Sequence, residues 1–179
     1  MQYSVVKYNR LDHFFDLEYF CERAQKQNLI NNASVEDLTR MHLFITYYNG
    51  DIIGTSDCHD FSEHYENTWR VFSRTCTLKE YRLKGFPRRI GVCACAGINV
   101  YSIPYQVNFA LSQGAKNIVY TTNNDKNGYS GSLKLDIHHR KYVDKCPEYE
   151  YYDEKKIYGV KQTVWKLLYK DVVNMEGKL

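Results

Sequence analysis

The sequence predicts an α/β fold in which a mixed, mostly antiparallel central sheet is flanked by helices. Three observations predict it: an amphipathic helix near the start, a β-hairpin after it, and a later strand–helix–strand order that allows one parallel strand pair. The length of 179 residues suits a single domain over residues 1–179 with its own hydrophobic core. Apolar residues make up 44% of the chain and charged residues 25%, as in an ordinary globular protein.

Two helices are predicted first. Apolar side chains recur at helical spacing over residues 11–24, and Asn9 or Asp12 stands where the first turn would begin. Ser34-Val-Glu-Asp37 resembles a capping box, in which a serine and an acidic side chain bind each other's backbone N–H groups. This motif predicts a short second helix.

The clearest local signal is a β-hairpin. Residues 42–48 and 51–58 have the composition of strands, and Asn49-Gly50 separates them. Asn-Gly favours a type I′ turn because both central residues must adopt positive φ. The polar residues 59–67 then interrupt the pattern, and their acidic side chains, together with Asp57, are interpreted as a solvated loop.

Residues 69–78 predict a third strand, whose side chains alternate between two faces. Trp69, Val71 and Ser73 are expected on one face, and Arg70, Phe72 and Arg74 on the other. An arginine within such a strand suits either an ion pair at the edge of the core or a functional role.

A basic segment, Tyr81-Arg-Leu-Lys-Gly-Phe-Pro-Arg-Arg89, follows this strand with four cations and one glycine in nine residues. Glycine lets backbone N–H groups approach an oxygen closely, and a following helix N-terminus adds partial positive charge. The segment therefore predicts a binding site for a phosphorylated ligand. The alternative is a solvated basic surface turn.

Ser102-Ile-Pro104 predicts the start of a helix, with Ser102 as its cap and Pro104 in its first turn, and Gly114 predicts its end. Residues 90–98, before it, fit either a helix or a buried strand. Residues 117–122 predict a strand that could run parallel to the third strand, because a helix connects the two.

The last third of the chain predicts a polar loop and a final strand pair. The loop spans residues 123–131, and a helix could follow over residues 132–142. Strands are predicted over residues 148–152 and 157–169, with Gly159 as a bulge in the second of them.

Charge and cysteine content exclude several classes of protein. The net charge of +3 indicates no general affinity for nucleic acid. The six cysteines follow no apolar leader segment, so reduced thiols in a cytoplasmic protein are expected. No run of about 20 apolar residues predicts a membrane span. Cys58-His59 with His64, and His138-His139, lack the spacing of zinc ligands, so no metal site is expected.

The order of elements and two motifs resemble the GNAT acyltransferase superfamily over most of residues 40–170. Its pyrophosphate-binding motif, Q/R-x-x-G-x-G/A after the fourth strand, is similar to Arg82-Leu-Lys-Gly85-Phe-Pro87, where Pro87 replaces the last small residue. The superfamily also places an asparagine after its fifth strand, beside the pantetheine arm of coenzyme A, and Asn123 and Asn124 stand there. The resemblance implies N-acyltransferase activity with acetyl-CoA or a related acyl-CoA.

The resemblance also implies roles for individual residues. A backbone N–H near Leu78 would polarise the thioester carbonyl, and Asn123 or Asn124 would fix the pantetheine. The leaving thiolate would receive a proton from Tyr129, Ser130 or Ser132. The pyrophosphate end of the donor would be held by the basic segment, through Arg82, Lys84, Gly85, Phe86 and Arg88.

One stretch departs from the superfamily in length. From Gly85 to Asn117 the chain is longer than the single helix that GNAT proteins place there. Either residues 86–101 are an insertion, or the helix that faces the phosphates begins at Ser102 rather than at Phe86.

A narrower resemblance concerns the acceptor. Asn124-Asp-Lys-Asn-Gly128-Tyr-Ser-Gly131 is similar to a D-x-x-x-G-H-x-G segment of phage and mobile-element GNAT proteins, with Tyr129 in place of the histidine and Asn124 in place of the aspartate. That branch includes the Mom protein, which modifies adenine in DNA. Ser73-Arg74 is also similar to it, which makes Arg74 a candidate catalytic residue. The resemblance implies an amine of a nucleobase or another macromolecule as acceptor, and a host cytoplasm if the chain is phage-encoded.

Other interpretations remain open at this point. A Mom-like DNA-modifying enzyme and a non-catalytic binding module on the same fold are the alternative functions. The cations of the basic segment and the tyrosines at 149, 151 and 152 suit base stacking, or a solvated hairpin face. Asn123-Asn124 also fits a simple turn, and Tyr129 a packing residue.

Overall fold

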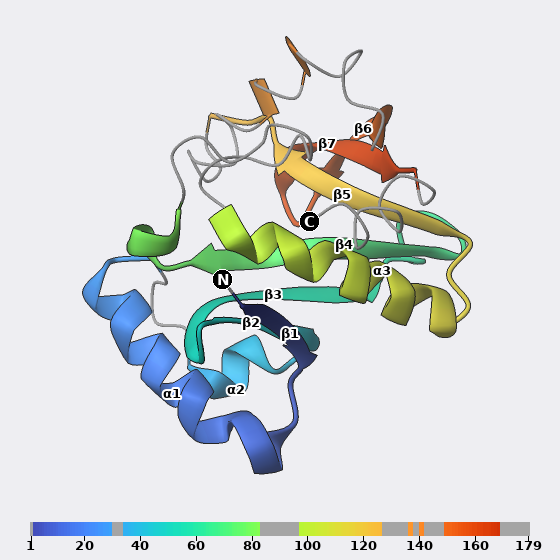
Figure 1. Ribbon diagram of the computed structural model, residues 1–179. Helices are drawn as coiled ribbons and strands as arrows, with labels where there is room; N and C mark the ends of the chain where they lie inside the picture. The colour runs from blue at the N-terminus through green and yellow to red at the C-terminus, as the bar shows by residue number, and fades with distance from the viewer. Residues whose placement is uncertain are drawn as a thin grey trace.

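The computed structural model describes residues 2–29, 34–82, 97–126, 136–137, 140–141 and 149–168 (Figure 1). Its strands form one seven-stranded sheet in the order β1-β2-β3-β4-β5-β7-β6. Neighbouring strands are antiparallel except β4 and β5, which are parallel. The mixed sheet and its parallel pair, predicted from the sequence, are therefore confirmed. The elements are β1 Tyr3–Lys7, α1 Arg10–Lys26, α2 Val35–Leu38, β2 His42–Tyr48, β3 Asp51–Asp60, β4 Thr68–Thr77, η1 Lys79–Tyr81, η3 Gly97–Tyr101, α3 Ser102–Ser112, β5 Asn117–Asn123, β6 Tyr149–Ile157 and β7 Val160–Leu167.

Both predicted helix starts in the first forty residues are confirmed. Asn9, rather than Asp12, caps α1, because its side-chain oxygen accepts a hydrogen bond from Leu11 N at 2.9 Å. The capping box of α2 is present: Ser34 Oγ accepts from Asp37 N at 3.1 Å, and the Asp37 carboxylate accepts from Ser34 N at 3.4 Å. Each cap supplies an acceptor to an N–H that has no partner within the helix.

Two tight turns join antiparallel strands. Asn49 and Gly50 both have positive φ, 49° and 83°, as a type I′ turn requires. Tyr158 and Gly159 repeat this geometry between β6 and β7, with φ of 49° and 79°. The prediction of a bulge at Gly159 is therefore wrong: the glycine lies in the turn, and β6 continues through charged residues to Ile157.

The sequence did not indicate β1. This edge strand pairs with β2, from Tyr3 opposite Tyr48 to Lys7 opposite Phe44. Its five residues alternate weakly and only Val5 is buried, so the strand depends on pairing with β2 rather than on its own pattern.

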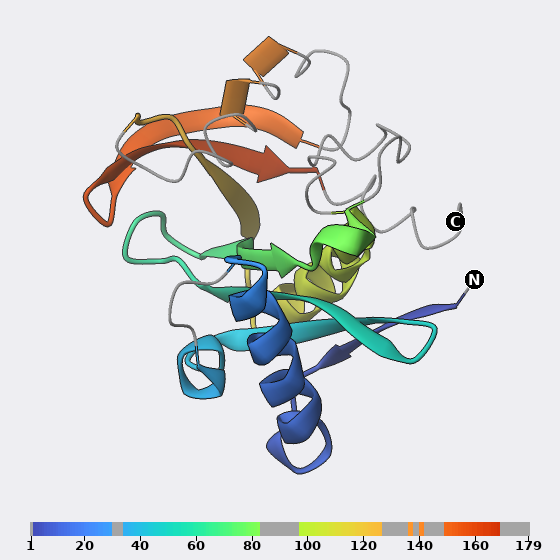
Figure 2. The same ribbon diagram turned by 90° about the vertical axis from the view of Figure 1, so that its left-hand side faces the viewer.

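The helices cover opposite faces of the sheet (Figures 1 and 2). On β2, Leu43 and Ile45 pack with α1 in one hydrophobic cluster, whereas Phe44 packs with α3 in another. Because successive side chains of a strand point to opposite faces, α1 and α2 lie on one face and α3 on the other. We call these the α1 face and the α3 face.

Two bulges interrupt β4. Thr55 pairs with Cys76 and Asp57 with Ser73, so β4 advances by three residues where β3 advances by two. The same shift recurs between Ser73 and Arg70, because Arg70 pairs with His59. Phe72 and Arg74 adopt positive φ of 54° and 44°, an unusual conformation for large side chains. The predicted alternation is therefore wrong, because Phe72 packs in the same cluster as Trp69 and Val71.

Two buried amides attach the segment before and within α3 to the sheet. Asn99 of η3 bonds to Thr46 Oγ1 at 2.8 Å, Thr55 O at 3.0 Å and Cys76 O at 3.1 Å, which links it to three strands. Gln106 of α3 accepts from the backbone N of Phe72 at 2.8 Å. Both side chains are fully buried.

The predicted helix cap at Ser102 is wrong. The N-cap of α3 is Tyr101, without a side-chain cap, because the 3₁₀ turn η3 runs directly into the helix. Ser102 Oγ instead accepts from Gln106 Nε2 at 3.0 Å. The predicted end of the helix is confirmed, since Gln113 is the C-cap and Gly114 follows with φ of 90°.

Candidate active site

The parallel strands β4 and β5 pair over a short length. Described hydrogen-bonded partners run from Thr68 opposite Asn117 to Arg70 opposite Val119, although both strands continue further. Figure 1 shows the two strands diverging beyond this point. The separation begins where the first bulge turns β4, and Gln106 of α3 takes the N–H of Phe72 there.

Hydrogen bonds to backbone carbonyls fix the residues around the end of β4. Leu78 is fully buried, and its N–H donates to Ile53 O of β3 at 3.0 Å. This N–H therefore points away from β5, and a backbone donor for a thioester would have to come from a neighbour of Leu78. Arg82 is half-buried and donates from Nε to Thr77 O at 2.8 Å. The other predicted members of the basic segment, Lys84, Gly85, Phe86 and Arg88, lie outside the described residues.

The two asparagines after β5 have different surroundings. Asn123 bonds to the backbone of Asp125 through both side-chain atoms, at 3.0 and 2.8 Å, which matches the turn interpretation. Asn124 donates to Thr163 Oγ1 at 3.3 Å and to the Glu154 carboxylate. Its side-chain oxygen is buried and has no hydrogen-bond partner among the described residues. Tyr129, Ser130 and Ser132 lie outside the described ranges.

A buried polar network that the sequence did not indicate joins β5, β7 and the segment at 136–141. Trp165 Nε1 donates to Thr122 Oγ1 at 2.8 Å, and Thr122 donates to Asp136 Oδ1 at 2.6 Å. Arg140 binds Asp136 at 2.8 Å and Glu154 at 2.9 Å. This network fixes Asp136 and Arg140, which follow the predicted residues Tyr129, Ser130 and Ser132 in the sequence.

We expect Asp136→Ala to lower the free energy of unfolding by about 2 kcal/mol, because a buried hydroxyl and a guanidinium both lose their acceptor. Urea unfolding followed by tryptophan fluorescence measures this. Asp136→Asn, which keeps an oxygen for Thr122, should lose about half as much. Equal losses in the two variants would contradict the role assigned to the Thr122 hydrogen bond.

Arg74, the candidate catalytic residue on β4, has three partners. Its Nε donates to Asp57 Oδ2 at 2.6 Å, and its terminal nitrogens donate to the carbonyls of Asp37 at 2.8 Å and Leu38 at 3.3 Å. These contacts tie α2 to the sheet, and they match the ion-pair interpretation of this arginine.

The interpretation of Asp57 as part of a solvated loop is wrong. The bulges turn it inward, and it is fully buried in β3. Buried atoms without hydrogen-bond partners among the described residues cluster around it, on Thr55, Asp57, His59 and Arg70. Sequence composition gave no sign of this cluster, because the residues come together through the irregular pairing of β3 with β4.

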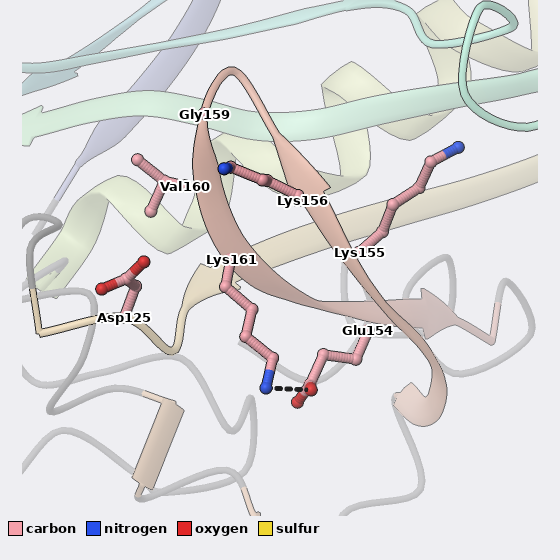
Figure 3. Close-up of a pocket in the computed structure, with 7 residues that line it drawn as sticks. All are labelled: Asp125, Glu154, Lys155, Lys156, Gly159, Val160 and Lys161. Carbon is pink, nitrogen blue, oxygen red and sulfur yellow. Dashed lines mark ion pairs between the residues drawn. The ribbon is translucent and has the colours of Figure 1, made fainter.

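The β6–β7 hairpin carries a shallow pocket of about 490 Å³ beside Asp125 (Figure 3). Lys155, Lys156 and Lys161 line it, and Lys161 pairs with Glu154 at 2.6 Å. Tyr151, Tyr152 and Tyr158 of the same hairpin are 51%, 45% and 64% exposed. The hairpin thus presents cations and aromatic rings together.

Two features are absent from the part of the chain that the structure describes. No helix there is both long and apolar enough to cross a membrane. No group of three or more His, Cys, Asp or Glu side chains there is arranged to hold a metal ion.

Solved structures resemble this one in fold. A GNAT-family acetyltransferase from Streptococcus pneumoniae has a TM-score of 0.53 and 10% identity, covering 92% of this chain and 98% of its own. Naa50 from Arabidopsis thaliana, in complex with the bisubstrate analogue CoA-Ac-MVNAL, has a TM-score of 0.52 and 13% identity. The match covers 94% of this chain and 99% of Naa50. N-acetylglutamate synthase from Neisseria gonorrhoeae, complexed with coenzyme A and N-acetyl-glutamate, has a TM-score of 0.54 and 9% identity. The match covers 94% of this chain and 36% of the synthase. No protein-family model and no curated protein matches the sequence. These likenesses concern architecture: the chain has the GNAT acyltransferase fold.

Proposed function

We propose that this chain is an acyl-CoA-dependent N-acyltransferase. The observation that carries the proposal is the early end of β4–β5 pairing at Arg70, beside α3 and on the strand that leads through η1 to the basic segment. Two structures of the same fold are complexes with coenzyme A or a CoA bisubstrate analogue. They support acetyl-CoA or a related acyl-CoA as the donor.

The described residues fit such a donor. Arg82 places a cation at the end of β4, and Asn124 offers a buried oxygen without a partner among the described residues. We assign Arg82 to the pyrophosphate and Asn124, rather than Asn123, to the pantetheine amides. When bound, the donor supplies a thioester carbonyl open to attack by an amine. The remaining members of the two groups keep their predicted roles: Lys84, Gly85, Phe86 and Arg88 at the pyrophosphate, and Tyr129, Ser130 or Ser132 at the thiolate.

We propose an amine of a nucleobase or another macromolecule as the acceptor. The β6–β7 hairpin supports this, because Lys155 and Lys156 lie on the strand that also exposes Tyr151 and Tyr152. Cations beside aromatic rings suit nucleic acid, where phosphates meet lysine and bases stack on tyrosine. The buried free thiols of Cys21, Cys58 and Cys76 support a reducing compartment, the cytoplasm.

Titration of coenzyme A by calorimetry tests the donor site. We expect Arg82→Ala and Gly85→Asp each to weaken binding about tenfold or more, because a charged hydrogen bond to phosphate is lost or a negative charge is added. Arg40→Ala is the control, since Arg40 pairs with Asp37 on the surface far along the chain from the basic segment. Wild-type affinity in both site variants would overturn the donor assignment.

Turnover separates an enzyme from a binding module. Thiol release from acetyl-CoA in the presence of an amine supports transfer, whereas a folded protein that binds no coenzyme A supports the non-catalytic module. Mass spectrometry of nucleosides, after incubation with DNA and acetyl-CoA, tests the Mom-like alternative. A new base adduct supports it.

A further inference from the structure

The polar cluster on the α1 face includes a carboxylate and an imidazole that face each other. Asp57 Oδ1 lies 3.7 Å from His59 Nδ1, and the exposed fractions of the two side chains are 1% and 9%. Neither of these atoms, nor His59 Nε2, has a hydrogen-bond partner among the described residues. Because buried polar atoms are normally satisfied, an unfilled set of this kind indicates a site for a ligand or a reacting group.

His59 also lines a pocket of about 600 Å³. The pocket is bounded by the segment from α2 to β2, including Thr39, Met41 and Leu43, and by Tyr158 of the β6–β7 turn. Asp57 does not line it. His59 therefore lies between the buried carboxylate and a space that a small group could enter.

The pairing of β3 with β4 places this pair beside the point where β4 leaves β5. His59 is opposite Arg70, the last β4 residue that pairs with β5, and Asp57 is opposite Ser73 in the bulge. Adjacent strands are about 4.8 Å apart, so the pair lies one strand from the opening. An acceptor on the α1 face and a donor at the opening would meet there.

We propose that His59 is the general base for the acceptor amine and that Asp57 is its positioning residue; this rests on the proposed acyl transfer. The amine nitrogen forms a bond to the thioester carbonyl carbon, and its proton passes to His59 Nε2. The carbon–sulfur bond then breaks, and the thiolate leaves with its electron pair and takes up a proton. The Asp57 carboxylate, with Oδ1 3.7 Å from Nδ1, orients the ring electrostatically and balances the imidazolium charge that forms, as a carboxylate does behind a catalytic histidine.

The charges around His59 favour a neutral amine. Arg70 lies opposite it on β4, and Arg74 already pairs with Asp57. Burial is the main cause that lowers the pKa of Arg70, with the Asp57 charge acting against it. Asp60 on β3 and His42 on β2 also interact with His59. The pocket is also lined by Lys7 and Arg40 and by Asp60 and Glu63, whose charges balance. The two arginines beside the buried carboxylate therefore leave a net positive charge, which disfavours a bound ammonium and suits a base that removes the proton.

The test measures thiol release from acetyl-CoA with n-butylamine, spermidine and adenosine as acceptors, from pH 6 to pH 9. We expect His59→Ala to lower kcat about 100-fold with coenzyme A affinity unchanged. Added imidazole should raise the kcat of this variant about tenfold. We expect Asp57→Asn to lower kcat about tenfold and to change the pH dependence of kcat. His13→Ala is the matched control and should keep wild-type kcat, because His13 is a half-buried residue of α1 that does not line this pocket.

The outcomes separate this inference from the proposed function. Undiminished kcat in His59→Ala, or a loss that imidazole does not restore, overturns the general base while leaving acyl transfer intact. A wild-type protein that binds coenzyme A but releases no thiol with any of the three acceptors overturns acyl transfer and the base together. Circular dichroism of His59→Ala and Asp57→Asn shows that each variant is folded, so that a loss of fold is not mistaken for a loss of base.

Discussion

Replacing Asn99 with alanine is expected to lower the free energy of unfolding by about 3 kcal/mol. The Asn99 amide is fully buried and bonds to Thr46 on β2, the Thr55 carbonyl on β3 and the Cys76 carbonyl on β4. Alanine would leave a buried hydroxyl and two buried carbonyls short of a partner. Each such group costs about 1 kcal/mol or more when it loses its hydrogen bond without access to water.

Gly54 shows how closely Asn99 approaches the sheet. A Cβ at Gly54 would lie 2.8 Å from Asn99 Cγ and 3.0 Å from Cys76 O. The asparagine amide therefore occupies the space that any larger residue at position 54 would need. Removing the amide leaves a gap over β3 at Gly54, which has no side chain to fill it. This gap adds to the loss of stability.

Urea unfolding measures the Asn99→Ala effect, and Asn108→Ala is the matched control. Asn108 lies on the exposed side of α3, where alanine is a better helix former, so its variant should be within about 0.5 kcal/mol of wild type. Coenzyme A binding should weaken in Asn99→Ala as well, because η3 leads into α3 beside the opening between β4 and β5. A loss below about 1 kcal/mol would contradict the bridging role of Asn99.

The sequence predicted those elements whose cause is local. The Asn49-Gly50 turn needs positive φ at two adjacent residues, and the Ser34–Asp37 capping box closes within four residues. In both cases neighbouring residues determine the structure, so the pattern can be recognised without the rest of the chain. β1 was missed for the opposite reason: its five residues become a strand only beside β2.

The predictions from the sequence were wrong for those residues whose contacts come from distant parts of the chain. Asn99 lies among residues of three strands, and no local motif marks it. Asp57 looked solvated because acidic residues follow it closely, yet the β4 bulges bury it beside Arg74. Likewise Asn123 and Asn124 look equivalent in the sequence, but successive side chains of an extended segment point in opposite directions. Asn123 therefore closes a turn, whereas Asn124 reaches β7.

The two bulges of β4 connect the donor and acceptor sides of the proposed site. They turn Phe72 toward the α3 face, where Gln106 binds its N–H, and they leave Arg74 on the α1 face with Asp57. A regular strand would have continued to pair with β5 and would have placed Phe72 and Arg74 together. The positive φ values of these two residues thus open the sheet and assemble the cluster around His59 at the same point.

Arg74→Ala is expected to lower the free energy of unfolding by about 2 kcal/mol, because it leaves the Asp57 carboxylate buried without its cation. The Asp57 side chain is 1% exposed and that of Arg74 is 38% exposed, so the loss should be smaller than for a fully buried ion pair. Two α2 carbonyls, of Asp37 and Leu38, also lose a donor.

A double-mutant cycle with Asp57→Asn separates the ion pair from these carbonyl contacts, because the pair contributes only while both partners are charged. Arg40→Ala, which removes an exposed arginine, should change stability by no more than about 0.5 kcal/mol. We expect a coupling energy of about 1 kcal/mol or more between Arg74 and Asp57. If Arg74→Ala instead keeps wild-type stability and loses turnover, Arg74 acts in catalysis rather than as the partner that holds Asp57 in place behind His59.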